Sequence, residues 1–346
     1  MVFRSRTAKA ERLARASEVS LPEGQHVTTE MSSSVLLPGA PLSDQVFSAC
    51  GAIFTWEDVR EWMVADGTWA ACARRAAEGR ELALTDISGP SGDALRQAAQ
   101  RFRRDRKLIA GEDLSHWLAH WGISEEEWVD WLDRSLRREA HPGSARPSTE
   151  ASEQETWVEA VCSRELGLAA RNMSRAYGAW CERSGGEAPP AAERFALLRR
   201  AYEDFVEQAP DRAELERVIS SNAVGWIQIA FESASFPTSD AAREALASCR
   251  DDGESLASVA TLAGVDFEDA TVRAEDVEPR LRTVLVSAPV DAPVPAGTPE
   301  DPGRVVVVRG RRQPKIDDPA DEELAAAVVA EQRVQSATDR WVTWRA

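Results

Sequence analysis

The hydrophobic pattern of this chain changes its period near Val224, and no other feature constrains the fold as strongly. Before this position, apolar residues recur mostly every three or four places, which is typical of amphipathic helices. From Trp226 to Phe231 the pattern alternates as in a strand, and the β-branched run Val305–Val308 favours a second strand. We therefore predict an α+β protein, mostly α, in which a helical domain is followed by a small unit that contains a sheet.

Capping signals divide the first part of the chain into helices. Thr55 predicts one helix start, and Ser124 with Glu127 forms a capping box for another. Gly122 predicts the end of a helix over 112–121, because glycine readily adopts the left-handed conformation that closes a helix. The predicted segments are a flexible tail (1–45), a helical domain (46–150) and a helical arm (151–220) with helices over 153–184 and 191–208.

The second part of the chain is predicted to mix strands and helices. The unit over 221–315 is expected to hold the two strands named above, helices over 239–250 and 255–262, and a further strand over 283–287. A C-terminal helix is predicted within 316–346. Because Trp341 and Trp344 would be exposed on a free tail, we predict that this helix packs back on the helical domain.

The charge and the length of the apolar runs exclude two classes of function. The net charge of −17 over 346 residues would repel a phosphate backbone, so we expect no nucleic-acid binding. No apolar run approaches the roughly 20 residues that cross a bilayer, so we expect no membrane span. The basic N-terminal residues are not followed by an apolar stretch, so secretion by a standard signal is not expected.

The cysteines are scattered and odd in number. There are five of them, with no CxxC pair: Cys50, Cys72, Cys162, Cys181 and Cys249. This pattern does not favour a disulfide framework, so we expect reduced thiols and a cytoplasmic protein. Because no histidine is close in sequence, we interpret Cys162 and Cys181 as small core residues and not as nucleophiles.

Short segments of the chain, taken in order, carry a resemblance to a known family. Residues 51–59, 108–112 and 122–128 are similar to the N-terminal domain of SurA and PpiC-type foldases. Residues 224–315 look like the parvulin domain of that family. The segments that carry this second likeness are 240–246, 252–260, 285–290 and 303–308. The resemblance covers about residues 50–346 and implies that the C-terminal helix returns to complete the first domain.

The departures from the family pattern imply a degenerate parvulin-like domain. Active parvulins carry one histidine in the first strand and one in the last, and these positions correspond here to Gln228 and Val305. All four histidines of this chain precede the parvulin-like region. The glycine-rich middle strand of the family is also missing from our prediction, because only about twenty residues, 264–283, are left for it. The resemblance therefore implies a fold without a working isomerase site.

The twelve tryptophans allow two interpretations. At helical spacing most of them are expected in the core, but large rings with one N–H group also suit a binding groove. We keep both interpretations open for the aromatic residues that could bind a peptide: Trp117, Trp121, Trp128, Trp131, Trp226 and Phe231.

A weak metal-site pattern also occurs. Glu112, His116 and His120 are spaced by four residues, so they share one helix face and could hold zinc. The alternative is that they are surface groups beside the tryptophans. Since no fourth ligand is evident, we expect neither a metal nor another cofactor.

Three functions remain open. The first is non-catalytic, chaperone-like binding of an extended or unfolded polypeptide, through groove contacts and strand addition. Similar proteins act in the maturation of ribosomally made peptides, so the resemblance implies a precursor peptide and its modifying enzyme as partners. The alternatives are an active peptidyl-prolyl isomerase and a structural subunit that docks a partner enzyme.

Overall fold

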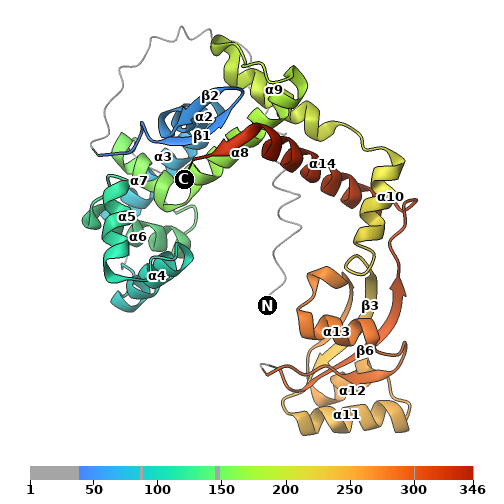
Figure 1. The fold of residues 1–346 in the computed structure, drawn as a ribbon. Coiled ribbons are helices and arrows are strands. Elements are labelled where there is room, and N and C mark those ends of the chain that lie inside the picture. Colours follow the sequence, from blue (N-terminus) through green and yellow to red (C-terminus); the bar gives the residue numbers. More distant parts are fainter. Residues whose placement is uncertain (1–38, 86–88, 145–148, 300, 346) are drawn as a thin grey trace. The chain divides into compact units, whose positions relative to one another are not determined.

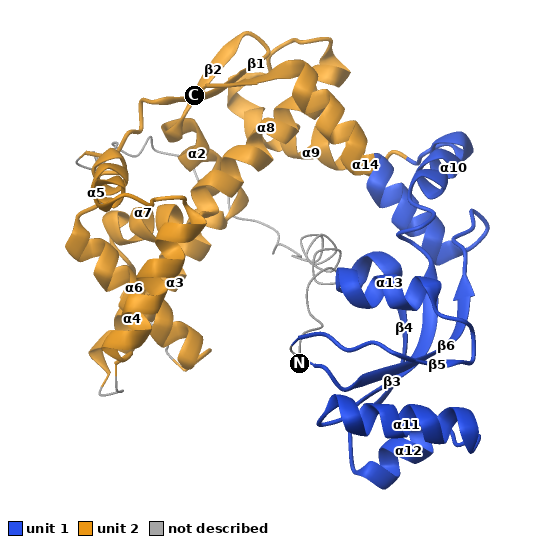
Figure 2. Ribbon diagram, turned by 60° about the horizontal axis from the view of Figure 1, so that its bottom comes forward, with its two compact units in different colours: residues 1–28, 209–329 blue, residues 29–208, 330–346 orange. Residues whose placement is uncertain are grey.

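The computed structural model describes residues 39–85, 89–144, 149–299 and 301–345. The described chain divides into two compact units (Figure 2). We call residues 39–208 with 330–345 the helical unit and residues 209–329 the sheet unit. The chain is an α+β protein, mostly α, as the sequence predicts. Most of the predicted flexible tail, 1–45, lies outside the described residues.

The helical unit combines helices with a small sheet. Its sheet has the antiparallel order β2-β1-β7, made of β1 (Gln45–Ala49), β2 (Ala52–Thr55) and β7 (Val342–Trp344). Its helices are α2 (Trp56–Asp66), α3 (Thr68–Leu84), α4 (Gly92–Asp105), α5 (Gly111–His120), α6 (Glu125–Ala140), α7 (Glu153–Cys162), α8 (Glu165–Ser184), η1 (Ala191–Glu193) and α9 (Arg194–Glu207). Figure 1 shows the order of these elements.

The predicted helix ends of this unit have physical causes that the structure makes visible. Ser124 and Glu127 form the capping box that starts α6. Gly122 has a φ of 62°, and a Cβ there would lie 2.5 Å from the backbone carbon of Gly39. Both the left-handed conformation and the close approach therefore require glycine at this position.

The predicted helical arm, 151–220, is not a separate body. Its helices α7 and α8 contribute Trp157, Leu166 and Met173 to the same core as the preceding helices. The predicted single helix over 153–184 is also broken, because Arg164 is left-handed with a φ of 71°. The helical domain therefore extends through residue 208.

The sheet unit is a four-stranded antiparallel sheet covered by helices. The strand order is β4-β3-β6-β5. The elements are α10 (Arg212–Ser221), β3 (Gln228–Ser235), α11 (Ser239–Asp251), α12 (Leu256–Ala263), β4 (Phe267–Arg273), η2 (Ala274–Asp276), α13 (Pro279–Ser287), β5 (Pro293–Pro295) and β6 (Arg304–Arg312). Ile229 and Val306 pack toward α13 on one face, whereas Val305 and Val307 pack with α11 and α12 on the other.

Two local predictions for this unit are wrong. The segment 283–287, predicted as a strand, is the end of α13. Glu278 accepts hydrogen bonds from the first N–H groups of this helix, and Pro279 occupies its first turn, so these residues fix a helix in spite of the β-branched side chains that follow. The segment 264–283, in which no strand was predicted, contains β4.

The C-terminal helix α14 (Pro319–Trp341) belongs to both units. Ala325 and Val329 pack with Trp226 in the sheet unit, so the predicted boundary at residue 315 is wrong. The end of the segment contacts the helical unit, where Trp341 Nε1 donates to Glu182 at 2.6 Å. The last residues form β7 in place of the predicted helix, and the ring of Trp344 lies 5.6 Å from that of Phe47.

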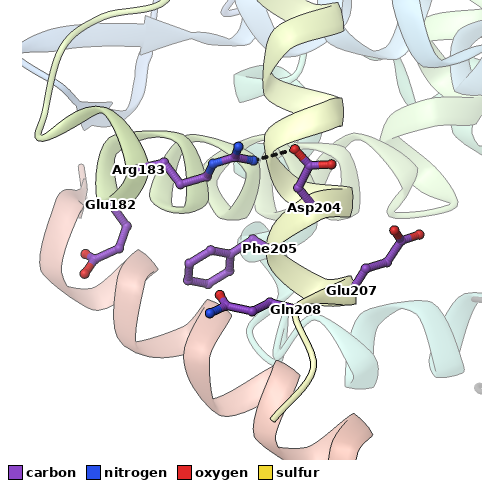
Figure 3. Close-up of a pocket in the computed structure, with 6 residues that line it drawn as sticks. All are labelled: Glu182, Arg183, Asp204, Phe205, Glu207 and Gln208. Carbon is purple, nitrogen blue, oxygen red and sulfur yellow. Dashed lines mark hydrogen bonds and ion pairs between the residues drawn. The ribbon is translucent and has the colours of Figure 1, made fainter. Parts of the chain in front are cut away.

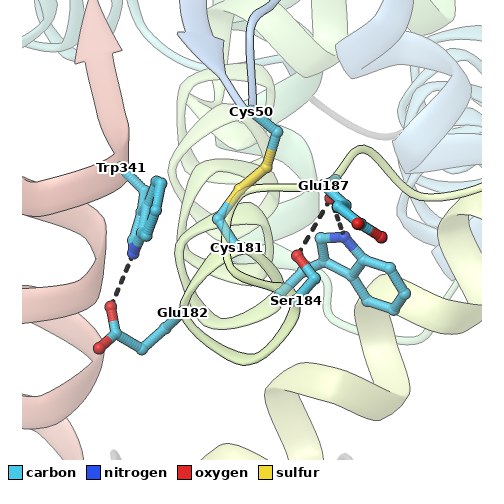
Figure 4. The surroundings of a disulfide bond; sticks show 7 residues. Cys50, Cys181, Glu182, Ser184, Glu187 and Trp341 are labelled. Carbon is cyan, nitrogen blue, oxygen red and sulfur yellow. Dashed lines mark hydrogen bonds between the residues drawn. A yellow bond between two sulfur atoms is a disulfide. The ribbon is translucent and has the colours of Figure 1, made fainter.

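A disulfide joins two distant parts of the helical unit. Cys50, in the turn between β1 and β2, is bonded to Cys181 on α8, and their Cα atoms are 6.2 Å apart (Figure 4). The expectation of reduced thiols is therefore wrong for this pair. The prediction of a cytoplasmic protein rested on those thiols and loses this support.

Candidate polypeptide-binding surface

Four of the candidate tryptophans lie in and around an aromatic cluster of the helical unit. The ring of Phe102 lies 5.3, 5.5 and 5.8 Å from the rings of Trp117, Trp128 and Trp131. Trp121 extends the cluster, since its ring is 6.2 Å from that of Trp117. Trp128 is buried, and the other three are half-buried. These side chains therefore serve mainly to pack α4, α5 and α6 together.

The polar edge of this cluster ends on a buried carboxylate. Glu159 is only 2% exposed, and its oxygens accept hydrogen bonds from Arg75, Arg138 and the indole N–H of Trp131. The distances are 2.9–3.1 Å. A carboxylate that is surrounded by donors in this way stabilises the fold and has no lone pair left for a ligand.

The other two aromatic candidates lie in the core of the sheet unit. Trp226 is 2% exposed between α10 and α14, and Phe231 is 3% exposed on the α13 face of the sheet. Neither ring is available to a peptide. The six candidates thus fall into three separate places of the chain and do not line one groove within either unit.

Gln228 and Val305, the two positions expected from the resemblance to match the parvulin histidines, are not brought together. Gln228 pairs with Arg312, whereas Val305 pairs with Ala234. Because Gln228 and Ala234 are six residues apart on β3, the two positions are separated by about 20 Å along the sheet. Val305 is fully buried beneath α11 and α12.

Gln228 instead belongs to a cluster of charges at the end of the sheet. Its Oε1 accepts a long hydrogen bond, 3.4 Å, from Arg312 Nε. Arg312 also contacts Asp318 at 2.7 Å and the fully buried Asp321 at 3.1 Å. This cluster joins β6 to the start of α14, so its arrangement indicates a structural role.

The possible zinc ligands and the free thiols show no site. Glu112, His116 and His120 are exposed on α5, and among the described residues no group of three or more acidic, histidine or cysteine side chains is placed to hold a metal. Burial raises the pKa of the Cys72 thiol to about 12, although Arg75 opposes this change. Burial also raises the pKa of Cys162. Both thiols therefore stay protonated and poorly nucleophilic at neutral pH.

A shallow hollow lies where α8 and α9 end. Its volume is about 550 Å³, and Figure 3 shows the side chains that line it. They are Glu182, Arg183, Asp204, Phe205, Glu207 and Gln208. Arg183 and Asp204 pair across it at 2.7 Å, and Glu182 is held by Trp341. Three of its four charged side chains are thus engaged, and only two of them, Arg183 and Asp204, with each other.

The outer edge of β4 is the feature of the sheet unit that is most open to a partner. Strand β4 pairs with β3 on one side, and the described sheet has no strand beyond it on the other. Next to β4, the N–H of Ala274 donates to Ile227 at 2.9 Å. Since hydrogen-bonded and non-hydrogen-bonded pairs alternate in an antiparallel ladder, the N–H and C=O groups of Phe267, Asp269, Thr271 and Arg273 point away from β3.

The side chains along this edge differ on the two faces. Ala270 and Val272 pack toward α13. Phe267, Asp269 and Thr271 lie on the opposite face and are exposed. Phe267 is 39% exposed, and Leu262, at the end of the preceding helix, is 84% exposed. An incoming strand would therefore meet free backbone groups and apolar side chains at the same end of β4.

Sequence reasoning missed this surface because β4 itself was missed. Acidic residues occupy the positions before and inside the strand, and acids are depleted in strands. The signal that remained was the pair Thr271-Val272 after the helix-ending Gly264. Charged residues are common on edge strands, where they limit unwanted pairing, so charge here indicated an edge and not the absence of a strand.

Comparison with known proteins finds a distant structural likeness and no match among protein families or curated proteins. No protein-family model matches the chain, and no curated protein matches it. A solved structure from Campylobacter jejuni, from work on PEB4 and the periplasmic protein Cj1289 as two structurally related SurA-like chaperones, matches 87% of this chain and 99% of its own length. Its sequence identity is 9% and its TM-score is 0.20, which is too low to support an argument about this protein. None of the described helices is long and apolar enough to cross a membrane.

Proposed function

We propose that this protein binds an extended segment of another polypeptide without catalysing a reaction on it. The binding surface is the outer edge of β4, where the segment is added to the sheet as a further strand. The observation that carries the proposal is the row of outward N–H and C=O groups from Phe267 to Arg273, which no described strand uses. Backbone hydrogen bonds of this kind accept many sequences, as a chaperone-like protein requires.

The sheet unit is proposed to be a degenerate parvulin-like domain. The element order supports this proposal, since a first strand is followed by two helices, a middle strand, a further helix and a final hairpin. The separation of Gln228 from Val305 supports the absence of catalysis, because a pair of groups about 20 Å apart does not act on one peptide bond. By the resemblance to SurA and PpiC-type foldases, the client is proposed to be a ribosomally made precursor peptide that a modifying enzyme also binds.

The test is a binding titration with a reduced and alkylated, permanently unfolded polypeptide that carries a fluorescent label. We expect a Kd in the micromolar range, about −8 kcal/mol. The informative variant is Thr271→Pro, because proline removes an N–H group that β3 does not use and is tolerated on edge strands. The lost hydrogen bond and the obstructing ring should weaken binding about tenfold, or about 1.4 kcal/mol.

The matched control is Thr271→Val, which keeps the N–H group and should bind like the unchanged protein. Circular dichroism of both variants verifies that the sheet is intact. Equal binding by Thr271→Pro and Thr271→Val would remove β4 as the site. A large acceleration of proline isomer exchange on short peptides, which otherwise takes tens to hundreds of seconds, would contradict the non-catalytic proposal.

A further inference from the structure

Acidic side chains gather at one end of the β4 edge. Asp266 precedes the strand, and Glu268 and Asp269 lie within it, all of them exposed. Glu268 accepts a hydrogen bond from Ser233 Oγ at 3.4 Å. Among the described residues, neither Asp266 nor Asp269 forms an ion pair or a side-chain hydrogen bond. This end of the edge therefore presents negative charge that the unit itself does not neutralise.

Strand β3, which pairs with β4, has no arginine, and the arginines of β4 and β6 are already engaged. Arg309 binds both oxygens of Glu232, at 2.8 and 2.9 Å, and also contacts Asp291 at 2.9 Å. Arg273, at the other end of β4, contacts Asp321 at 3.8 Å. A cation that pairs with Asp266 or Asp269 must therefore come from the bound partner.

The geometry of an added strand specifies where that cation would sit. Residues directly opposite in an antiparallel pair have Cβ atoms about 4.5–5.5 Å apart, so the residue opposite Asp269 is within reach of its carboxylate. Two places along, on the same face, the partner would meet the exposed ring of Phe267. The complementary segment thus carries a basic residue and an apolar residue two positions apart, on the same face, and few acids.

We infer that the partner of the β4 edge is a basic, extended polypeptide segment in which lysine or arginine lies two positions from an apolar residue. This inference rests on the proposed function, because it names the class of client for the same edge. It adds that charge selects the client, whereas the backbone edge alone would accept segments of any charge. Pairs between exposed charges are weak individually and are screened by salt, so the selection depends on ionic strength.

The experiment compares two labelled synthetic peptides that differ only in charge. In one, lysine lies two positions from valine or phenylalanine, on the same face of the extended peptide, and the other carries glutamate in place of each lysine. We expect the basic peptide to bind at least tenfold more tightly to the full chain in 20 mM salt. We also expect the double variant Asp266→Asn and Asp269→Asn to bind the basic peptide about threefold to tenfold more weakly, with a loss that disappears in 0.5 M salt.

The matched control makes the same change of charge at the other edge of the sheet. The control is the double variant Asp251→Asn and Asp252→Asn. Both aspartates are exposed at the end of α11, next to Arg250, which donates to the carbonyl of Pro293 in the opposite edge strand β5. This control should bind the basic peptide like the unchanged protein. An equal loss in both double variants would show only a long-range effect of net charge and would overturn the inference.

The remaining outcomes separate this inference from the proposed function. If both peptides bind equally and Thr271→Pro weakens both, the edge binds polypeptide but charge does not select it, so the inference fails alone. If neither peptide binds in a way that Thr271→Pro affects, the proposed function fails as well. If replacing Arg4, Arg6, Lys9, Arg12 and Arg15 by glutamine tightens binding, the occupant is the N-terminal segment of this chain, and the assignment to another polypeptide is overturned.

Discussion

The two units of this protein use their residues in opposite ways. The helical unit directs most of its aromatic side chains and one carboxylate, that of Glu159, inward, where they and the Cys50–Cys181 disulfide hold distant segments together. The sheet unit is smaller and keeps one strand edge open along β4. The residues most prominent in the sequence thus stabilise one unit, whereas the proposed binding surface of the other is mainly backbone.

This contrast matters for how a binding protein is recognised. Tryptophans suit cores and grooves equally well by composition, so their number alone indicates neither. In the helical unit their neighbours decide the matter, since the indole N–H groups of Trp131 and Trp157 bond to Glu159 and to the carbonyl of Trp121. A free strand edge, in contrast, has a built-in capacity to bind another chain.

The largest effect is expected from the buried carboxylate of the helical unit. Glu159→Gln should lower the free energy of unfolding of this unit by about 4 kcal/mol, because it leaves two guanidinium groups without their buried partner. Urea unfolding followed by tryptophan fluorescence measures this, since eleven of the twelve tryptophans lie in the helical unit and only Trp226 lies in the other.

The control for this change is Glu331→Gln. Glu331 pairs with Arg175 at 2.6 Å but is 60% exposed, so its loss should cost less than about 1 kcal/mol. Equal effects of the two substitutions would show that Glu159 is not the buried centre of a network.

The next effect concerns the disulfide. Cys50→Ser should destabilise the helical unit by about 2–4 kcal/mol, because the bond closes a long loop with a sequence separation of 131. Reducing the unchanged protein should give the same loss in urea unfolding, and reducing the variant should give none. Cys249→Ser, in the sheet unit, is the matched substitution that should leave this transition in place. If the reductant has no effect on the unchanged protein, the bond does not form in solution.

A smaller effect is expected from pH. Burial alone would raise the pKa of Glu127, but hydrogen bonds from Ser124 and Gln154 lower it overall. In the same way, hydrogen bonds from Ser152 and the charges of Arg80 and Arg134 lower the pKa of Glu155 against its burial. A lowered pKa in the folded state stabilises the fold above the unfolded pKa of about 4.3, and this contribution is lost as the pH falls through the folded value.

We therefore expect the helical unit to lose stability below about pH 4.5, and the variants Glu127→Gln and Glu155→Gln to lose less over the same range. Urea midpoints at several pH values between 7 and 3 measure this. Glu126 is exposed on the same helix as Glu127, so Glu126→Gln should lose stability at low pH as steeply as the unchanged protein. If all three variants lose stability equally steeply at low pH, Glu127 and Glu155 do not cause the loss.

The smallest effect is expected at Gln228. Its bond to Arg312 is long, so Gln228→Ala should lower the stability of the sheet unit by less than about 1 kcal/mol, measured by calorimetry. The same variant should leave both polypeptide binding and proline exchange as they were. If proline isomer exchange is slower with Gln228→Ala than with the unchanged protein, Gln228 has a catalytic role.

Much of the fold could be predicted from local signals. The capping residues Ser124 and Glu127 and the left-handed Gly122 gave correct helix ends because these effects act within a few residues. The change of period near Val224 correctly indicated a sheet. The segment 283–287 was predicted as a strand because its β-branched side chains favour one. The cap that fixes the helix, Glu278, lies five residues before this segment.

The candidate site could not be predicted in the same way. Which edge of a sheet stays open depends on strand order, and the order β4-β3-β6-β5 is set by packing between residues far apart in the chain. The disulfide also joins residues brought together only by the fold. The resemblance to the parvulin family placed Gln228 and Val305 in one site, but the strand register separates them.

Residue-resolved hydrogen exchange at β4 tests the central claim most directly. In the free protein the outward amides of Phe267, Asp269, Thr271 and Arg273 should exchange fast, while the amides of Glu268, Ala270 and Val272, which are bonded to β3, should exchange slowly. Saturation with an unfolded polypeptide should slow the outward set and leave the inward set nearly unchanged. If the polypeptide binds and the outward amides still exchange at their free rates, strand addition at β4 is wrong.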